Sequence, residues 1–345
     1  MNGEAIFLAQ FRRLALWVIL AGWLAGAAGR LAAHEIQPAY LELRQTGPET
    51  LAALWKVPAR DDLIGHLTPR LPAAWKQVGE AAVTRTAEAY VERFNVACPG
   101  GPDGAVIGVG GSAAAIADVL VRVVRTDGRA EIFRLTVNHL EQAIAAEPSR
   151  LGQAWAFLSL GVEHILKGVD HLLFVLGLLL IVRDRWMLLK TITAFTVAHS
   201  LTLAIATLGY ARAPLPPLNA AIALSILFLG PEMVRVRRGQ TSLTIAHPWV
   251  VAFAFGLLHG FGFASGLTAL GLARNEIPLA LLLFNVGVEL GQLCFVALIL
   301  LLARSFRTLE IRWARWAEAL PAYTVGGLGA YWTIQRTVVL LAALR

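Results

Sequence analysis

The residues best suited to chemistry lie in one short polar stretch at the start of the first long apolar segment. The stretch holds two histidines, two carboxylates and a lysine: Glu163, His164, Lys167, Asp170 and His171. The apolar run after it, residues 172–182, is shorter than the roughly 20 residues that a membrane-spanning helix needs, so such a helix must include the polar stretch. Ionisable groups inside a bilayer cost on the order of 2.5–3.5 kcal/mol each and usually mark an ion pathway or binding site.

The composition places most of the chain in a membrane. Of the 345 residues, 57% are hydrophobic and 15% are charged, and the mean hydropathy is +0.62. The net charge of +7 comes mainly from arginines beside apolar runs, which is typical of membrane orientation and not of a nucleic-acid surface. Cys98 and Cys294 lie in different parts of the chain, so neither a disulfide between them nor a cysteine metal cluster is expected.

The N-terminus has the three-part form of a secretory signal peptide. Residues 1–33 contain two arginines, an apolar run and a group of small residues. Cleavage is predicted after Ala33, and an uncleaved membrane anchor is the alternative. In either case the next part of the chain is expected to be exported.

Residues 34–148 have the pattern of a small exported β-domain. Short runs alternate between apolar and polar residues, and the clearest are 119–124 and 132–137. Asp127 and Gly128 lie between these two runs, which is typical of a β-hairpin. We predict an antiparallel β-sandwich.

Residues 149–345 are predicted to form an all-α bundle of six transmembrane helices. The apolar segments lie at about 158–182, 187–208, 216–236, 248–272, 277–303 and 318–343. Arginines gather in every second connection, which the positive-inside rule assigns to the cytoplasm. The chain is therefore predicted to be a multi-pass protein of the bacterial inner (plasma) membrane, with the β-domain and the C-terminus outside the cytoplasm.

Counting residues along these segments places several polar side chains at one depth. At 1.5 Å per residue, three histidines and a glutamine lie roughly 18–22 Å from the inner face: His171, His199, His259 and Gln292. Glu289 lies one turn further out than Gln292. Hydrogen bonding between helices is the alternative role for any one of them, but together they favour a metal site. The expected supporting polar residues are Glu163, Lys167, Thr196, Asn285 and Gln292.

The donor groups indicate which metals fit. Neutral imidazole and carboxylate suit Ni²⁺, Co²⁺ or Zn²⁺, and the lack of clustered Cys or Met argues against Cu(I). We expect five side chains to meet on one ion: Asp170, His171, His199, His259 and Glu289. His164 lies about 10.5 Å from His171 along an ideal helix, too far to bind the same ion. Either the helix opens near Gly168, or the two histidines are separate stations on a path; we prefer two stations, with His164 near the outer mouth.

These residues resemble the motifs of the HupE/UreJ family of membrane proteins, which is associated with nickel and cobalt uptake. The similarity covers about residues 155–343, and the chain is most similar to the branch with an exported N-terminal domain. The motifs are His164 followed after five residues by Asp170-His171, then FTVAHS at 195–200, FGLLHGFGF at 255–263 and FNVGVE at 284–289. The resemblance implies that the metal-handling residues are His164, Asp170, His171, His199 and His259.

The chain departs from the family pattern at two places. Ile165 follows the first histidine, where the better-known permeases usually have proline. The segment after His259 lacks the acidic residue that those permeases carry there, and we expect Glu289 to take its place.

A permease for a divalent transition-metal ion, nickel or cobalt first, is the preferred function. The sequence has no P-loop motif, so the membrane potential or a proton gradient is expected to drive transport. The expected partners are the metal ion, the lipid bilayer and a periplasmic metal donor.

Two other functions stay open. One is an intramembrane zinc-dependent hydrolase with Glu289 as general base, and residues 262–266 weakly resemble the serine loop of rhomboid-type proteases. The other is a metal sensor or partner protein whose working part is the β-domain, with His34 at a new N-terminus. Ion uptake, measured against turnover of a lipid or peptide substrate, distinguishes transport from hydrolysis.

Overall fold

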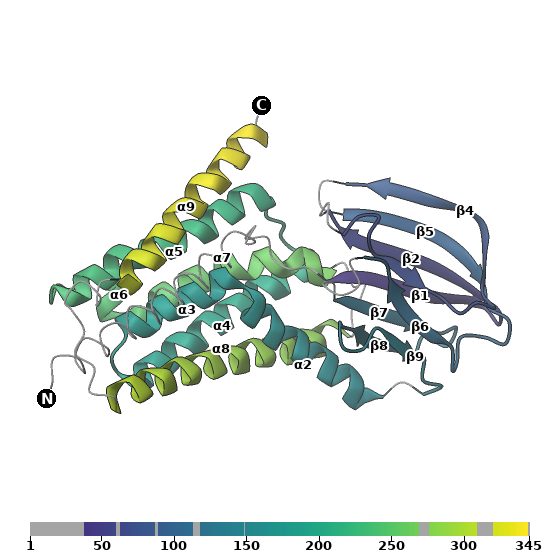
Figure 1. Ribbon diagram of the computed structural model, residues 1–345, viewed down its shortest axis with the longest axis horizontal. Helices are drawn as coiled ribbons and strands as arrows, with labels where there is room; N and C mark the ends of the chain where they lie inside the picture. The colour runs from purple at the N-terminus through teal and green to yellow at the C-terminus, as the bar shows by residue number, and fades with distance from the viewer. Residues whose placement is uncertain are drawn as a thin grey trace, which may run out of the picture.

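The computed structural model describes residues 38–59, 63–86, 89–112, 118–147, 149–268, 276–308 and 320–343. A β-domain comes first and a group of helices follows, with the β-domain at one end of the helices (Figure 1). The predicted signal peptide and His34 lie outside the described residues.

The β-domain contains two sheets. Its strands are β1 (Ala39–Gly47), β2 (Thr50–Pro58), β3 (Thr68–Arg70), β4 (Lys76–Arg85), β5 (Ala89–Ala97), β6 (Val106–Gly110), β7 (Val119–Val124), β8 (Ala130–Leu135) and β9 (Glu141–Ala143). The larger sheet has the order β4-β5-β2-β1-β7-β8, and the smaller sheet has the order β3-β6-β9. Side chains alternate along β1, so Leu41 and Leu43 belong to the β-domain core that also holds Ile107 of the smaller sheet. The predicted β-rich N-terminal domain is confirmed.

One strand pair differs from the predicted antiparallel sandwich. β1 and β7 pair in parallel, with Ala39 opposite Val119 and Arg44 opposite Val124, so the larger sheet is mixed. The prediction of a purely antiparallel domain is therefore wrong at this pair. The reason lies in the connection, because β3 and β6 of the smaller sheet come between β1 and β7 in the chain, and a long crossover permits parallel pairing.

The predicted hairpin is confirmed. β7 and β8 pair antiparallel, with Val119 opposite Leu135 and Val124 opposite Ala130. The turn between them contains Gly128, whose φ is +83° and whose N–H donates to the Arg125 carbonyl oxygen at 3.0 Å. Glycine adopts such a φ without a steric penalty, so the Asp-Gly signal located the turn correctly.

One face of the larger sheet lines the core of the β-domain, and the other face packs against the helices. Tyr40, Leu120 and Ile132 form one buried apolar cluster with helix residues such as Phe157 and Leu160. The sheet therefore buries side chains on both faces. Burial raises the pKa of the Tyr40 hydroxyl, and the nearby Glu42 carboxylate raises it further, so Tyr40 stays neutral and donates to Glu42 at 2.8 Å.

The second part of the chain is helical. Its helices are α2 (Arg150–Lys167), α3 (Val169–Ile181), α4 (Arg185–Thr207), α5 (Leu215–Arg237), α6 (Leu243–Ala246), α7 (Pro248–Thr268), α8 (Ile277–Thr308) and α9 (Leu320–Ala343). Polar caps set two of the starts. The Ser149 hydroxyl accepts from the Gly152 N–H at 3.1 Å before α2, and the Asp184 carboxylate accepts from the Met187 N–H at 2.8 Å before α4.

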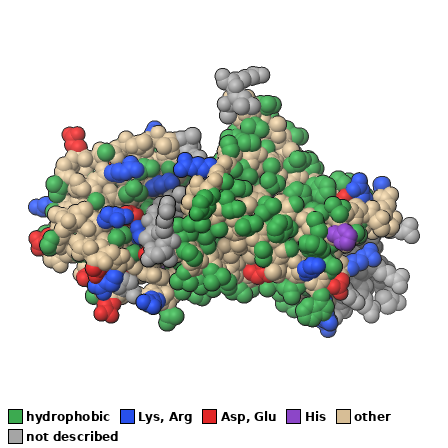
Figure 2. All heavy atoms as spheres, turned by 180° about the vertical axis from the view of Figure 1, so that it is seen from behind, with side chains coloured by type: hydrophobic (Ala, Val, Ile, Leu, Met, Phe, Trp, Pro, Cys, Tyr) green, Lys and Arg blue, Asp and Glu red, His purple; other side chains and the backbone are tan. Residues whose placement is uncertain are grey.

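Several helices are suited to a membrane. Among the described residues, α4, α5 and the 277–304 part of α8 are long and apolar enough to cross one, and α2 with α3 is a fourth candidate. α7 is apolar but shorter over 248–264. Figure 2 shows hydrophobic side chains over most of the helical part, whereas charged side chains gather on the β-domain and at the opposite end. The chain is thus a multi-pass membrane protein, and the number of six spans stays a prediction.

Candidate metal site

The helix that carries the sequence motif breaks at Gly168. α2 ends at Lys167 and α3 begins at Val169, and the two axes differ by 72°. A Cβ built on Gly168 would lie 2.7 Å from His171 Nδ1 and 2.8 Å from the His164 carbonyl oxygen. Both distances are shorter than real Cβ contacts, so glycine is required at the bend.

The bend brings His164 to His171, with ring centroids 4.8 Å apart. The preferred prediction of two separate stations is therefore wrong, and the alternative that the helix opens near Gly168 is confirmed. An ideal helix would have separated the two rings by about two turns. The break shortens that separation because α3 leaves the end of α2 at 72° and does not continue along its axis.

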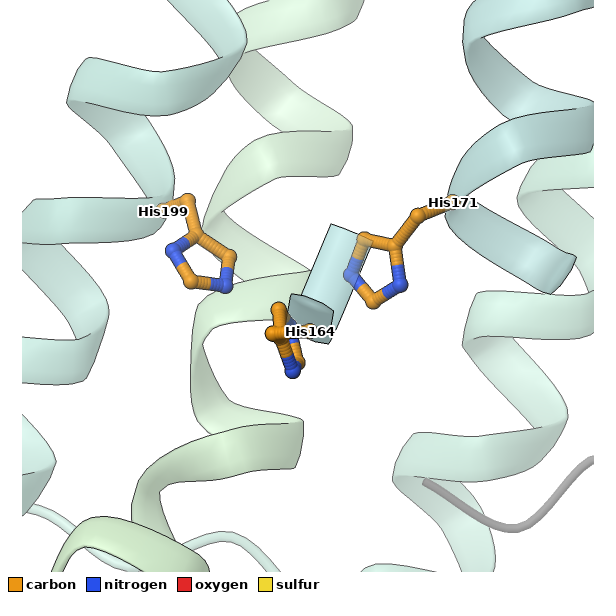
Figure 3. Close-up of side chains that lie close together, drawn as sticks. All are labelled: His164, His171 and His199. Atoms are coloured by element: carbon orange, nitrogen blue, oxygen red, sulfur yellow. The ribbon is translucent and has the colours of Figure 1, made fainter. Parts of the chain in front are cut away.

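Three histidines from three helices face one another. His164 of α2, His171 of α3 and His199 of α4 each offer a ring nitrogen, and these three nitrogens lie within 4.8 Å of one another. Figure 3 shows the three rings converging on one small space. His171 and His199 are fully buried, and His164 is partly buried. We refer to these three residues as the three-histidine group.

His259 lies beside the three-histidine group. Its ring centroid is 4.7 Å from that of His171, and its Nε2 is 3.2 Å from the Ser225 hydroxyl of α5. The Nδ1 atom of His259 is buried and has no hydrogen-bond partner in the described part of the chain. The sequence-predicted layer of histidines is thus brought together, with His259 next to His171.

The orientation of His199 is set by Asn285 of α8. The amide nitrogen of Asn285 donates to the Leu281 carbonyl oxygen at 2.8 Å, which leaves its Oδ1 to face His199 Nδ1 at 3.1 Å. Because an amide oxygen only accepts, Nδ1 must carry the proton. Nε2 then keeps its lone pair, and this buried atom has no hydrogen-bond partner among the described residues. Such an arrangement is typical of a metal-binding histidine.

Asp170 lies at the edge of the histidines and contacts α9. Its Oδ1 is 3.1 Å from His171 Nδ1, and its Oδ2 is 3.6 Å from Arg336 Nη2. Arg336 also donates from Nη1 to the Asn219 carbonyl oxygen at 2.8 Å. Arg336 is not among the site residues that the sequence analysis singled out. Its position in an apolar helix could have indicated a buried partner, because an arginine there requires a polar group to pair with.

Glu289 is not part of the three-histidine group. Its Oε1 accepts a hydrogen bond from the Thr193 hydroxyl at 2.6 Å, and Gln292 Oε1 accepts from the Thr196 hydroxyl at 2.9 Å. The expected convergence of Glu289 on the same ion is therefore not seen. The counted depth failed because α8 is offset along its axis relative to α4, so Asn285, seven residues before Gln292, lies level with His199.

Asn285 lies at the level of His199, while Glu289 and Gln292 lie further along α8. Glu289 accepts a hydrogen bond from Thr193 of α4, and Gln292 accepts one from Thr196 of α4. Together they form polar links between α4 and α8 that start at the histidines and follow α8 towards its C-terminal end.

Close helix contacts hold the histidines in place. A Cβ on Gly260 of α7 would lie 2.3 Å from the His199 carbonyl oxygen of α4. A Cβ on Gly161 of α2 would lie 2.0 Å from the Phe284 carbonyl oxygen of α8. Neither contact is possible for a larger residue without moving backbone, so glycine permits the approach that aligns these helices.

The remaining motif residues lie at the boundary with the β-domain. Glu163 of α2 forms an ion pair with Arg134 of β8, and Lys167 of α2 forms one with Asp118.

Residues 140–336, which are more than half of the chain, match the HupE / UreJ protein family. This chain belongs to the HupE/UreJ family.

The family match includes every element that contributes to the site. It begins just before β9 and ends at Arg336, so the histidine motif and the partner of Asp170 both fall inside it. Strands β1 to β8 fall outside it. No curated protein matches this family member.

Proposed function

We propose that this HupE/UreJ protein transports a divalent transition-metal ion, nickel or cobalt, through the histidines at the α2–α3 bend. The observation that carries the proposal is the three-histidine group, whose ring nitrogens lie within 4.8 Å of one another in the apolar part of the chain. Imidazole nitrogen is a preferred ligand of Ni²⁺, Co²⁺ and Zn²⁺.

The surroundings of the histidines support metal binding over simple helix packing. A buried imidazole that only joins helices is expected to use both ring nitrogens in hydrogen bonds. His199 uses only Nδ1, and His164 Nε2 is also buried without a hydrogen-bond partner in the part of the chain that the structure describes. Asp170 supplies a negative charge beside His171, which offsets part of the charge of a divalent ion.

A polar route from the site also supports transport. The links Thr196–Gln292 and Thr193–Glu289 follow α4 and α8 away from His199. Glu289 Oε2 and Gln292 Nε2 are buried and have no hydrogen-bond partner among the described residues, so both keep bonding capacity for a passing hydrated ion. By the positive-inside rule these links lie on the cytoplasmic side of the histidines.

The hydrolase alternative is not favoured by the geometry. Glu289, the residue considered as general base, bonds to Thr193 and lies outside the three-histidine group. A general base must reach the water that it activates directly or through one further water. The side chain of Ser265, from the run that resembles a serine loop, lies outside the described side chains.

Replacing His171 by alanine is expected to remove metal binding and transport together. Purified protein should bind Co²⁺ with a visible spectrum typical of nitrogen ligands, and proteoliposomes should accumulate Co²⁺ or Ni²⁺. His171→Ala should reduce both by about 100-fold, since loss of a ligand costs at least as much as loss of an outer-shell partner. His247→Ala, which changes an exposed histidine before α7, is the matched control. Binding without any uptake would rule out transport, and normal uptake by His171→Ala would rule out this site.

Replacing Asn285 by leucine is expected to weaken Co²⁺ affinity by about 10- to 100-fold while the three histidines remain. Without the Asn285 amide oxygen, His199 is free to protonate Nε2 instead of Nδ1 and to rotate. Titration of Co²⁺ by visible absorption measures the change. Gln292→Leu, on the same helix and paired with Thr196, should leave the equilibrium affinity within about threefold. Equal losses in the two variants would contradict the assigned role of Asn285.

A further inference from the structure

A compact ionic cluster lies between the β-domain and the start of the histidine motif. It contains two carboxylates and two cations, one of each from either side of the boundary: Asp118, Arg134, Glu163 and Lys167. The Lys167 ammonium is 2.5 Å from Asp118 Oδ2 and 2.7 Å from Glu163 Oε2. It therefore bridges one carboxylate of the β-domain and one carboxylate of α2. We refer to these four residues as the junction cluster.

Arg134 and Lys167 differ in how firmly they are held. Arg134 donates to both oxygens of Glu163, at 2.7 Å from Nη1 to Oε1, and its Nη2 is 3.0 Å from Asp118 Oδ2. Its side chain is only 7% exposed, whereas the side chain of Lys167 is 43% exposed. A planar guanidinium with several simultaneous bonds is the fixed member of such a cluster. The flexible, half-exposed Lys167 is the member that can move away from the two carboxylates.

The junction cluster and the histidines line the same cavity. This cavity has a volume of about 20 Å³, and its walls include all four junction residues together with His164 and His171. That volume holds about one water molecule. A hydrated divalent ion is larger, so the way from the β-domain side to His164 is closed in this conformation. All four residues of the junction cluster form part of the wall that narrows this way.

A second ionic contact anchors the β-domain elsewhere. Arg122 of β7 pairs with Glu42 of β1 at 3.4 Å and with Glu276, just before α8, at 3.0 Å. These residues do not line the cavity. The β-domain is therefore also tied to the helices by an ion pair that lies outside the wall of the cavity.

We propose that the β-domain supplies part of the gate to the histidine site, and that Lys167 is the cation that an arriving metal ion displaces. Asp118 and Glu163 then offer oxygen ligands to the ion before it reaches His164, the next residue after Glu163. This inference rests on the proposed transport function. It extends that function to Asp118 and Arg134, which lie outside the matched family region.

The charge of the junction cluster predicts opposite effects of two substitutions. The cluster is neutral, because two carboxylates face two cations. Lys167→Gln makes it negative and removes the bridging ammonium, so Co²⁺ should associate with the full-length protein about tenfold faster. Asp118→Asn makes it positive and leaves Lys167 on Glu163, so association should slow by about tenfold. Stopped-flow absorption measures both rates, and Lys76→Gln on exposed strand β4 is the control that should stay within twofold.

A thiol-accessibility assay tests the gate without any metal. Leu160 lines the cavity and is buried, so Leu160→Cys, in a background with Cys98→Ala and Cys294→Ser, reports access. Methanethiosulfonate ethylammonium should modify this cysteine several-fold faster when Lys167→Gln is added. Equal reactivity, or Co²⁺ association that changes in the same direction in Lys167→Gln and Asp118→Asn, would overturn the gate. Absence of Co²⁺ binding by the unmutated histidines would instead overturn the proposed function, even where the thiol result supports a closing role of Lys167.

Discussion

Gly168→Val is expected to abolish metal binding at the three-histidine group while most of the helical structure remains. The added Cβ would collide with the His164 carbonyl oxygen and the His171 ring, at 2.8 Å and 2.7 Å. The backbone must move to relieve these contacts, and this movement separates two of the three histidines. The affinity for Co²⁺ should fall by about 100-fold or more, because losing the geometry of two ligands exceeds the 10- to 100-fold cost of losing an outer-shell partner.

Visible absorption during Co²⁺ titration measures this loss, and circular dichroism reports whether the helices persist. Gly327→Val is the matched control, since a Cβ on Gly327 of α9 has no atom within 4 Å among the neighbours that the structure describes. The control should bind Co²⁺ normally. If Gly168→Val also binds with unchanged affinity, the bend is not what assembles the site.

Arg336→Leu is expected to lower the free energy of unfolding by about 3 kcal/mol, which is a large effect for one substitution. Asp170 and Arg336 are both largely buried, and removing one member of a buried ion pair leaves the other charge without compensation. Thermal unfolding of the purified protein in detergent measures the loss. Arg183→Leu, at an exposed position after α3, should change stability by less than about 0.5 kcal/mol.

The double variant Arg336→Leu with Asp170→Asn separates charge from packing. If the cost of Arg336→Leu comes from the uncompensated carboxylate, removing that charge should restore most of the lost stability. A double variant as unstable as the sum of the two single variants would show that Arg336 acts through its other contacts, such as the bond to the Asn219 carbonyl oxygen.

The sequence by itself determined the parts of this protein that depend on local patterns. Alternating residues located β7 and β8, and Asp127-Gly128 located their turn, because a tight turn needs a positive φ at one residue. Long apolar runs located helices such as α4, α5 and α8, which are long and apolar enough to cross a membrane. The histidines also stood out in the sequence, because ionisable side chains are costly inside an apolar helix.

The tertiary structure alone decided how these residues meet. Residue counting assumes straight helices that begin and end at known points, and neither assumption held. The bend at Gly168 brought His164 next to His171, and the offset of α8 along α4 placed Asn285 and not Gln292 beside His199. Bends and offsets between helices result from packing with distant residues, which periodicity along one segment does not contain.

The same physical reason accounts for the partners that sequence reasoning missed. Arg336 reaches Asp170 across 166 positions of the chain, the difference between 336 and 170. The β1–β7 parallel pair and the junction cluster are likewise contacts between segments that are distant in sequence. Local preference made each segment a strand or a helix. Only the packing of the β-domain on the helices brought Asp118 and Arg134 next to the histidine motif.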